Sequence, residues 1–273
     1  MIYLADSGST KTDWTRSDGR HQQTTGMNPA VMGDDDLCRT LRQVEGREEA
    51  TQVYYYGAGV RPELRSRMRQ LLLDAFPRAT SVVAESDLLG AARALCGNGE
   101  GVACILGTGA NSCLYDGRSI VANTPSLGYV IDDVGSGAAL GRRFLLELYK
   151  GTLTHLRDSF EQWSGLNAAG VIEHVYRRPQ PNRWLASLSP FVAANIEDEA
   201  VNELVMNGFR EFFRRNIVPY GRRDLPVAFV GSIAWYYRSQ LSAACEAEGF
   251  QLGVVLRSPL EGLQRYHGLD LAQ

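Results

Sequence analysis

This sequence of 273 residues lacks long apolar runs, an excess of basic charge and an evident targeting segment. No stretch approaches the roughly 18 apolar residues that a membrane helix needs, so we expect no membrane partner. Residues 1–6, MIYLAD, contain neither a basic segment nor a long apolar one, which predicts a cytoplasmic protein without an export signal. The net charge of -3 at pH 7, with scattered arginine and lysine, argues against nucleic acid as a partner.

Cysteine and histidine also lack the patterns that accompany disulfides or metal sites. The five cysteines are an odd number without a CxxC pair, so we expect reduced, mostly buried thiols. The four histidines, at positions 21, 155, 174 and 267, do not have the spacing of zinc ligands. A histidine-based metal site is therefore not expected.

The sequence does contain an alternation of short apolar strands with helices, which predicts an α/β fold. Strands are predicted at 2–5, 13–17, 20–25, 52–56 and 81–84, and helices at 34–44, 62–76 and 88–95. Asp18-Gly19 predicts a hairpin turn, because a tight turn needs positive φ. Ser86 or Asp87 is the expected N-cap of the third helix.

A weak internal repeat divides the chain. LADSGSTKTDWTRSDG, from residue 4, and CILGTGANSCLYDG, from residue 104, both read as strand, glycine-rich turn, strand and Asp-Gly turn. The stretch 137–219 is mostly helical in pattern, and 226–230 predicts a further strand. We therefore predict two α/β domains, 1–100 and 101–261, with a final helix at about 262–273 that packs back on the first.

Three glycine-rich turns could bind a phosphorylated ligand. The first, from Asp6 to Asp13, offers small residues whose backbone N–H groups can approach phosphate, and Asp6 could hold Mg²⁺. Lys11 would add positive charge or simply lie on the surface. The second turn, Gly107 to Ser112, repeats this chemistry, and the third, Gly231-Ser232, would let a nucleoside lie against the backbone. The GxxxxGK[ST] motif of a P-loop is absent.

In this order, the three turns resemble the phosphate-1, phosphate-2 and adenosine motifs of the sugar kinase/Hsp70/actin superfamily. The chain resembles more narrowly the BadF/BadG/BcrA/BcrD ATPase family, which includes N-acetylglucosamine kinases. The segments that carry this resemblance are GMNPAV, ESDLLGAARAL, LGTGANS, GYVIDDVGSGAALG and VGSIA, which begin at residues 26, 85, 106, 128 and 230. Pro259 and Gly262 resemble the family's closing adenosine-side turn.

The resemblance implies two ribonuclease H-like (actin-like ATPase) domains with a nucleotide cleft between them, and ATP and Mg²⁺ as cofactors. It implies that Asp6 is associated with the metal and that Asp87 is the general base. The residues that it assigns to ATP are Gly8, Ser9, Thr10, Lys11, Gly107, Thr108, Gly109, Gly231 and Ser232. The residues that it assigns to the sugar are Asn28, Asn111 and Asp133.

Asp87 also has a chemical argument of its own. A sugar hydroxyl must lose its proton as it attacks phosphorus, and a carboxylate at the mouth of an α/β sheet can accept that proton. Asp87 could instead merely cap its helix, and the neighbouring Glu85 is a rival base. The family's glycine and glutamate around Asp133 are replaced by Asp132 and Val134, which leaves the exact sugar open. Asp132 and Asp133 could also form a surface turn.

The leading hypothesis is therefore an ATP-dependent kinase for an amino sugar: N-acetylglucosamine, N-acetylmuramic acid or glucosamine. One alternative is an ATPase activator that carries an iron–sulfur cluster between subunits, because Cys104 and Cys113 flank the second turn. Another is a non-catalytic regulator that senses ATP or sugar. We expect no DNA-binding helix pair, because the fold begins at residue 2. A homodimer is compatible with the resemblance.

Overall fold

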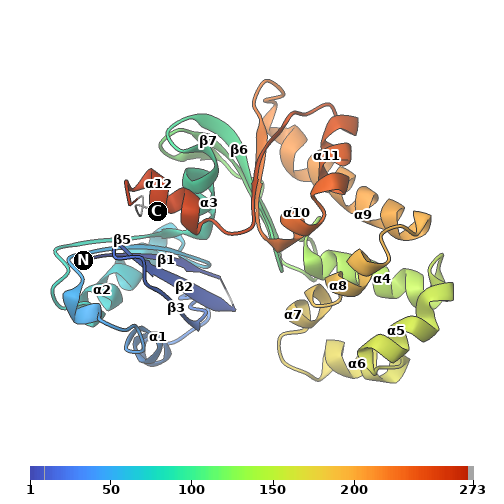
Figure 1. Ribbon diagram of the computed structural model, residues 1–273, viewed down its shortest axis with the longest axis horizontal. Coiled ribbons are helices and arrows are strands. Elements are labelled where there is room, and N and C mark those ends of the chain that lie inside the picture. Colours follow the sequence, from blue (N-terminus) through green and yellow to red (C-terminus); the bar gives the residue numbers. More distant parts are fainter. Residues whose placement is uncertain (9, 270–273) are drawn as a thin grey trace. The chain divides into compact units, whose positions relative to one another are not determined.

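The computed structural model describes residues 1–8 and 10–269, in two compact units (Figure 1). The first unit contains Met1–Gly99, Asp116–Ile120 and the chain from Ser258 onward, and the second contains Glu100–Tyr115 and Val121–Arg257. Ser9, predicted to bind ATP, lies outside the described residues, as do the last four positions of the helix predicted at 262–273.

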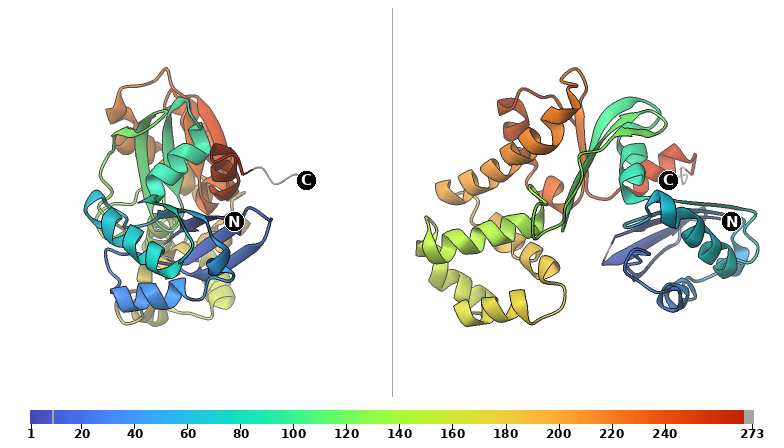
Figure 2. Two further views of the ribbon diagram at one scale, coloured as in Figure 1. Left: turned by 90° about the vertical axis from the view of Figure 1, so that its left-hand side faces the viewer. Right: turned by 180° about the vertical axis from the view of Figure 1, so that it is seen from behind.

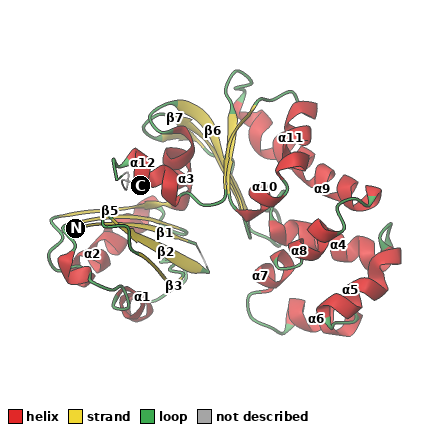
Figure 3. Cartoon of the chain, viewed as in Figure 1, coloured by secondary structure: helices red, strands yellow, loops and turns green. Residues whose placement is uncertain are grey.

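The first unit has a mixed five-stranded sheet in the order β3-β2-β1-β4-β5, coloured by structure type in Figure 3. Its elements are β1 (Ile2–Ser7), β2 (Lys11–Arg16), β3 (His21–Thr25), α1 (Asp34–Leu41), β4 (Gln52–Gly57), α2 (Arg65–Ala75), β5 (Ser81–Ser86), α3 (Asp87–Cys96) and α12 (Leu260–Tyr266). Strand β1 is antiparallel to β2 and parallel to β4, which is parallel to β5. The predicted strands and helices of this part are confirmed, and Ser86 caps α3 by accepting a hydrogen bond from the Leu89 N–H.

Alternating side chains bury both faces of this sheet. Tyr3, Trp14 and Tyr55 belong to a core shared with α1 and α2. Leu4 and Tyr56 lie on the opposite face in a core with Leu263 of α12 and a residue of α3. Gly262 lies within α12, where a Cβ would come within 2.4 Å of the Ala94 carbonyl oxygen of α3. Its small size therefore serves a helix–helix contact rather than an adenosine-side turn.

The second unit repeats this sheet topology, with the order β10-β9-β6-β7-β8. Its elements are β6 (Glu100–Leu106), β7 (Ala110–Asp116), β8 (Ile120–Ala122), α4 (Gly137–Lys150), α5 (Arg157–Ser164), α6 (Ala168–Tyr176), α7 (Pro181–Ala186), α8 (Ser189–Ala194), α9 (Glu199–Phe212), β9 (Val227–Val230), α10 (Ser232–Tyr236), α11 (Arg238–Ala247) and β10 (Leu252–Leu256). In each sheet the first strand lies at the centre, between its hairpin partner and a parallel strand. The shared topology explains the internal repeat in the sequence.

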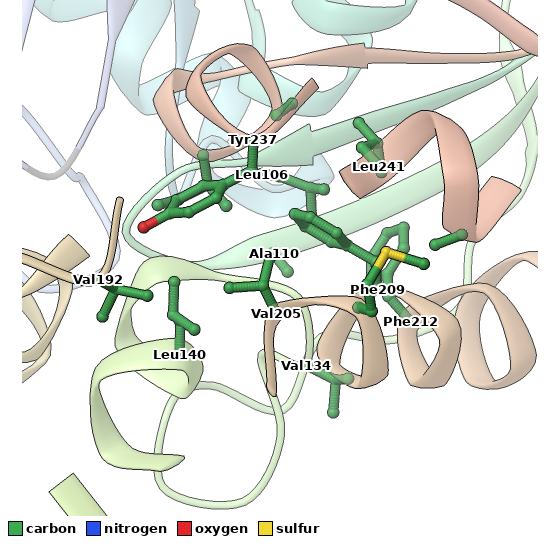
Figure 4. Packing of buried hydrophobic residues seen from close by; sticks show 14 of the residues in the cluster. Leu106, Ala110, Val134, Leu140, Val192, Val205, Phe209, Phe212, Tyr237 and Leu241 are labelled. Carbon is green, nitrogen blue, oxygen red and sulfur yellow. The ribbon is translucent and has the colours of Figure 1, made fainter. Parts of the chain in front are cut away.

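The helical stretch of the second unit follows β8, and α5 to α7 gather at one end of the unit (Figures 1 and 2). Its core contains Leu106 and Ala110 on either side of the second glycine turn, together with Phe209 and Phe212 of α9 (Figure 4). No helix within residues 1–8 and 10–269 is long and apolar enough to cross a membrane. The two sheets with their helices establish the α/β class.

Candidate functional site

Two carboxylates of the first unit follow parallel strands of one sheet. Asp6 lies near the end of β1, and Asp87 follows β5 as the first residue of α3. Because the carboxyl ends of parallel strands meet at one edge of a sheet, both side chains lie at the edge where ligands usually bind. The Asp87 Oδ1 atom accepts a hydrogen bond of 2.8 Å from the Leu88 N–H. Asp87 is therefore held at one oxygen, while Ser86 rather than Asp87 caps the helix.

Burial raises the pKa of both acids, and repulsion adds to the shift at Asp6. Asp6 and Asp87 are both half-buried. Loss of water contact, reinforced by the negative charges of Asp87 and Asp13, raises the pKa of Asp6 to about 7. Burial also raises the pKa of Asp87, while the hydrogen bond from the Leu88 N–H opposes that rise. Paired carboxylates with raised pKa values attract a proton or a cation, which is typical of functional sites.

Glu85, the rival base, is engaged elsewhere. Its Oε2 atom lies 2.9 Å from an Arg65 nitrogen in an ion pair. This ion pair places a cation directly against the Glu85 carboxylate. Asp87 has no comparable cation among the causes of its pKa shift. The local geometry thus favours Asp87 over Glu85 as a proton acceptor.

The first glycine turn connects β1 to β2 in the first unit. The Gly8 N–H donates to the Lys11 carbonyl oxygen at 3.0 Å, so this N–H is used within the turn itself. Lys11 is about half exposed and pairs with Asp13 at 2.8 Å. A ligand at this turn could therefore contact Gly8 and the half-buried Thr10. The positive charge of Lys11 is partly neutralised by Asp13.

The second glycine turn connects β6 to β7 in the second unit and is fixed by α4. The first N–H groups of α4, from Gly137 and Ala138, donate to the carbonyl oxygens of Gly107 and Thr108 at 2.8 and 3.1 Å. The N–H groups of Thr108 and Gly109 have no hydrogen-bond partner within the described part of the chain. A loop whose carbonyls are anchored and whose amides stay unpaired suits an anion such as phosphate.

The third turn lies directly against the second. Gly231 has φ of +125°, and a Cβ there would lie 2.3 Å from the Leu106 carbonyl oxygen and 3.2 Å from the Gly107 nitrogen. Its N–H donates to the Leu256 carbonyl oxygen at 3.0 Å. Only glycine fits this close approach. The structure therefore brings Gly231-Ser232 beside Gly107–Gly109 within one unit.

Asp133 also lies against the second turn. It is 8% exposed and has a φ of +57°. Its Oδ1 atom accepts hydrogen bonds from the Ser126 hydroxyl at 3.0 Å and from the Ala110 N–H at 3.4 Å. Burial raises the pKa of Asp133, and these hydrogen bonds oppose that rise. Asp133 is thus a buried carboxylate beside Gly109 and not part of a simple surface turn.

The two asparagines predicted to bind sugar belong to different units. In the first unit, the Asn28 Oδ1 atom accepts from the Ala30 N–H at 2.9 Å and lies close to Gly59, which has φ of +76°. In the second unit, the Asn111 Oδ1 atom accepts from the Ser112 N–H at 2.9 Å. Both asparagines are half-buried.

Comparison with solved structures gives a close relative. A protein from Porphyromonas gingivalis that has been proposed to be an N-acetylglucosamine kinase is 45% identical, with 99% of each chain covered and a TM-score of 0.95. Comparison with protein-family profiles and with curated proteins gives no match. The chain belongs to the N-acetylglucosamine kinase-like family.

More distant structures share the fold of this family. A second protein proposed to be an N-acetylglucosamine kinase, from Chromobacterium violaceum, is 19% identical over 97% of this chain and 98% of that one, with a TM-score of 0.71. A ROK family glucokinase from Streptomyces griseus, in complex with glucose and AMPPNP, is 14% identical over 98% and 97%, with a TM-score of 0.57. These similarities place the N-acetylglucosamine kinase-like fold among the two-domain sugar kinase and actin-like ATPase folds.

The structure adds a pocket in this kinase-like chain that sequence reasoning missed. It is a small pocket of about 20 Å³ between α4, α9 and α10. Its lining is mostly apolar and consists of Gly135, Ser136, Ala139, Leu140, Arg143, Leu204, Val205, Gly208, Phe209 and Ile233. Gly208 interrupts the apolar stripe of α9, and a Cβ there would meet no atom within 4 Å. The sequence signal that could have indicated this pocket is the glycine inside the helical pattern.

The residues at the sheet edge fit a divalent cation of the magnesium type. Mg²⁺ in phosphate-transfer sites usually takes one or two carboxylates and completes its shell with phosphate oxygens and water. Burial, together with the nearby negative charge of Asp87, raises the pKa of Asp6, which indicates a carboxylate pair short of positive charge. Within the described ranges, no group of three or more His, Cys, Asp or Glu side chains could form a protein-only metal site.

Proposed function

We propose that this protein transfers the γ-phosphoryl group of ATP to a hydroxyl of an amino sugar, with N-acetylglucosamine as the leading substrate. The observation that carries the proposal is Asp87: a half-buried carboxylate at the ligand-binding edge, held by the Leu88 N–H, with a raised pKa and no fixed cation. A carboxylate that accepts the proton of a hydroxyl must be able to bind that proton, and a cation fixed beside it would make it a poorer base. The 45% identity to the P. gingivalis protein supports the same activity.

In this proposal the residues divide by ligand. The second turn and the Gly231-Ser232 turn, together with Gly8, Ser9, Thr10 and Lys11 of the first turn, bind ATP. The unpaired N–H groups of Thr108 and Gly109 accept the negative charge of its phosphates. The nucleotide base binds at the small apolar pocket lined by Ile233, directly after Ser232, and this pocket must widen to admit it. Asn28, Asn111 and Asp133 bind the sugar.

The reaction follows from these placements. The sugar hydroxyl oxygen forms a bond to the γ-phosphorus while the bond from that phosphorus to the bridging oxygen of ADP breaks. The hydroxyl proton passes to the Asp87 carboxylate. Asp6 would hold Mg²⁺, which neutralises phosphate charge when bound. Because water would compete with the sugar as acceptor, exclusion of water at the sheet edge determines how much ATP is lost to hydrolysis.

The precise family and sugar are finer proposals. We assign the chain to the BadF/BadG/BcrA/BcrD type on its motif order. Val134, in place of the family's glutamate, is 7% exposed and packs in the core of the second unit (Figure 4). A buried valine cannot contact a sugar hydroxyl as a glutamate would. The site therefore has one polar ligand fewer, and N-acetylmuramic acid and glucosamine remain as alternatives to test.

The iron–sulfur alternative is disfavoured by burial. Cys104 and Cys113 are each 0% exposed. A cluster shared between subunits needs thiolates that reach the protein surface, and burial keeps a thiol inert. Iron and sulfide analysis of the purified protein tests this point, and we expect neither element at stoichiometric levels.

The proposed function is tested by ADP release in a coupled assay with a panel of sugars. The panel contains N-acetylglucosamine, N-acetylmuramic acid, glucosamine, N-acetylmannosamine and glucose, each with ATP and Mg²⁺. We expect sugar-dependent ADP release, strongest with an amino sugar, and a phosphorylated sugar detected by mass spectrometry. Tight ATP binding without turnover on any sugar would contradict the proposal and favour a sensor.

A further inference from the structure

Asn123, just after β8, joins the end of that strand to the start of β7. Its Nδ2 atom lies 3.0 Å from the Asn111 Oδ1 atom. The same nitrogen lies 2.7 Å from the Ser112 carbonyl oxygen and 3.1 Å from that of Thr124. An amide nitrogen carries two hydrogens, so these three acceptors share both of them. Asn123 is exposed, yet all of its donor capacity is used within the protein.

The backbone of Ser112 sets the direction of both side-chain amides. The two ends of an asparagine amide are similar in shape, and their assignment depends on the partners. The Ser112 carbonyl can only accept, so the nitrogen of Asn123 must face it. The Ser112 N–H can only donate, so the oxygen of Asn111 must face it. The two assignments agree, because the Asn123 nitrogen then meets the Asn111 oxygen.

This arrangement leaves Asn111 with one kind of group to offer. Its Oδ1 atom accepts from both the Ser112 N–H and the Asn123 amide, which uses both lone pairs. Its Nδ2 atom has no hydrogen-bond partner among residues 1–8 and 10–269. Asn111 therefore presents a hydrogen-bond donor, which requires an oxygen acceptor on the ligand. A hydroxyl or an acetamido carbonyl provides one, whereas an ammonium group does not.

We propose that Asn123 is a positioning residue of the sugar site, which holds the Asn111 amide with its Nδ2 atom toward a sugar oxygen. This inference rests on the proposed function, in which Asn111 binds the sugar. The segment around Asn123 is also held independently, because the Thr124 N–H donates to the Tyr220 hydroxyl at 2.9 Å and its Oγ1 donates to the Asn216 carbonyl at 2.9 Å. Removing the Asn123 side chain should thus release Asn111 without freeing the segment.

Steady-state kinetics of two substitutions tests the Asn123–Asn111 hydrogen bond. One substitution removes this bond, and the other replaces its donor with an acceptor. Asn123→Ala removes one neutral hydrogen bond, so we expect the KM for the sugar to rise by about threefold to tenfold. The kcat should change by less than about twofold, because the contact binds substrate and transition state alike. Asn123→Asp should raise the KM further, since a carboxylate cannot donate to the Asn111 oxygen and instead attracts its nitrogen.

Two controls exclude a merely structural effect. Thr124→Val removes the hydroxyl bond to Asn216 in the same segment without touching Asn111, and its KM for the sugar should equal that of the unmodified protein. The double variant Asn111→Ala/Asn123→Ala should have the same KM as Asn111→Ala alone, because Asn123 acts through Asn111. Additive effects, an unchanged KM in Asn123→Ala, or an equal rise in Thr124→Val would overturn the proposal.

A measurement without turnover tests the same arrangement. In side-chain amide NMR spectra, the NH₂ protons of Asn123 should exchange with water more slowly than those of Asn111. Equal exchange, or slower exchange at Asn111, would contradict the assigned amide directions. A protein that phosphorylates no sugar would contradict the proposed function instead, and the amide spectra would still decide how Asn123 holds Asn111.

Discussion

Replacing Gly231 with alanine tests how closely the third turn approaches the second. The glycine φ is +125°, and the new Cβ would lie 2.3 Å from the Leu106 carbonyl oxygen. Since such contacts essentially never fall below 3.0 Å, the end of β6 or β9 must move by about 0.7 Å. The strained backbone and the overlap each cost about 1–3 kcal/mol. We therefore expect Gly231→Ala to lose roughly 2–6 kcal/mol of unfolding free energy.

Urea denaturation followed by circular dichroism measures this loss, and Gly107→Ala is the matched control. Gly107 lies in the adjoining turn, but a Cβ there would meet no atom within 4 Å. We expect Gly107→Ala to change the unfolding free energy by less than about 1 kcal/mol. Equal stability of the two variants would refute the close approach that places the adenosine-side turn beside the phosphate turn.

Three further predictions concern an acid, a pocket and a helix contact. The pKa of Asp6 is about 7 in the folded protein, against an ordinary value of 3.8. Between pH 3.8 and pH 7, the folded state therefore keeps a proton on Asp6 that the unfolded state has lost. Stability therefore falls as pH rises through this window, and Asp6→Asn should stabilise the metal-free protein by roughly 2–4 kcal/mol at pH 8 but little at pH 4, measured by thermal unfolding. Gly208→Leu should fill the pocket and raise the KM for ATP by at least about tenfold with the sugar KM unchanged; an unchanged ATP KM would remove the base from that pocket. Gly262→Ala should lower stability by about 2 kcal/mol or more through its clash with Ala94 but leave the ATP KM unchanged, and the reverse pattern would restore an adenosine-side role.

Local signals predicted the parts of the fold that depend on neighbouring residues. Asp18-Gly19 and Asp116-Gly117 both stand at hairpin turns, and each glycine has positive φ. The N-cap at Ser86 was predictable because it requires only a side-chain oxygen three residues before a free helical N–H, here that of Leu89. The repeat of strand and glycine turn indicated a duplicated topology, which the two sheet orders share.

Contacts between distant residues were not predictable in the same way. The Arg65–Glu85 ion pair depends on how α2 approaches the edge strand β5, which no local pattern specifies. Asn123 reaches Asn111 only because β7 and β8 form a hairpin that brings residues twelve positions apart together. Asp133 is buried and has a positive φ, which is uncommon for a non-glycine residue and which its sequence neighbours do not indicate. Tertiary packing determines each of these features.

The most direct test of the account is the turnover of Asp87→Asn on the sugar that the panel identifies, with Glu85→Gln as the matched control. Asparagine keeps the size of the side chain and the acceptor for the Leu88 N–H but cannot take a proton. We predict that Asp87→Asn lowers kcat by about 10²- to 10⁴-fold with the Kd for ATP unchanged, while Glu85→Gln keeps kcat within about tenfold. Full turnover in Asp87→Asn, or a greater loss in Glu85→Gln, would contradict the assignment of Asp87 as the base.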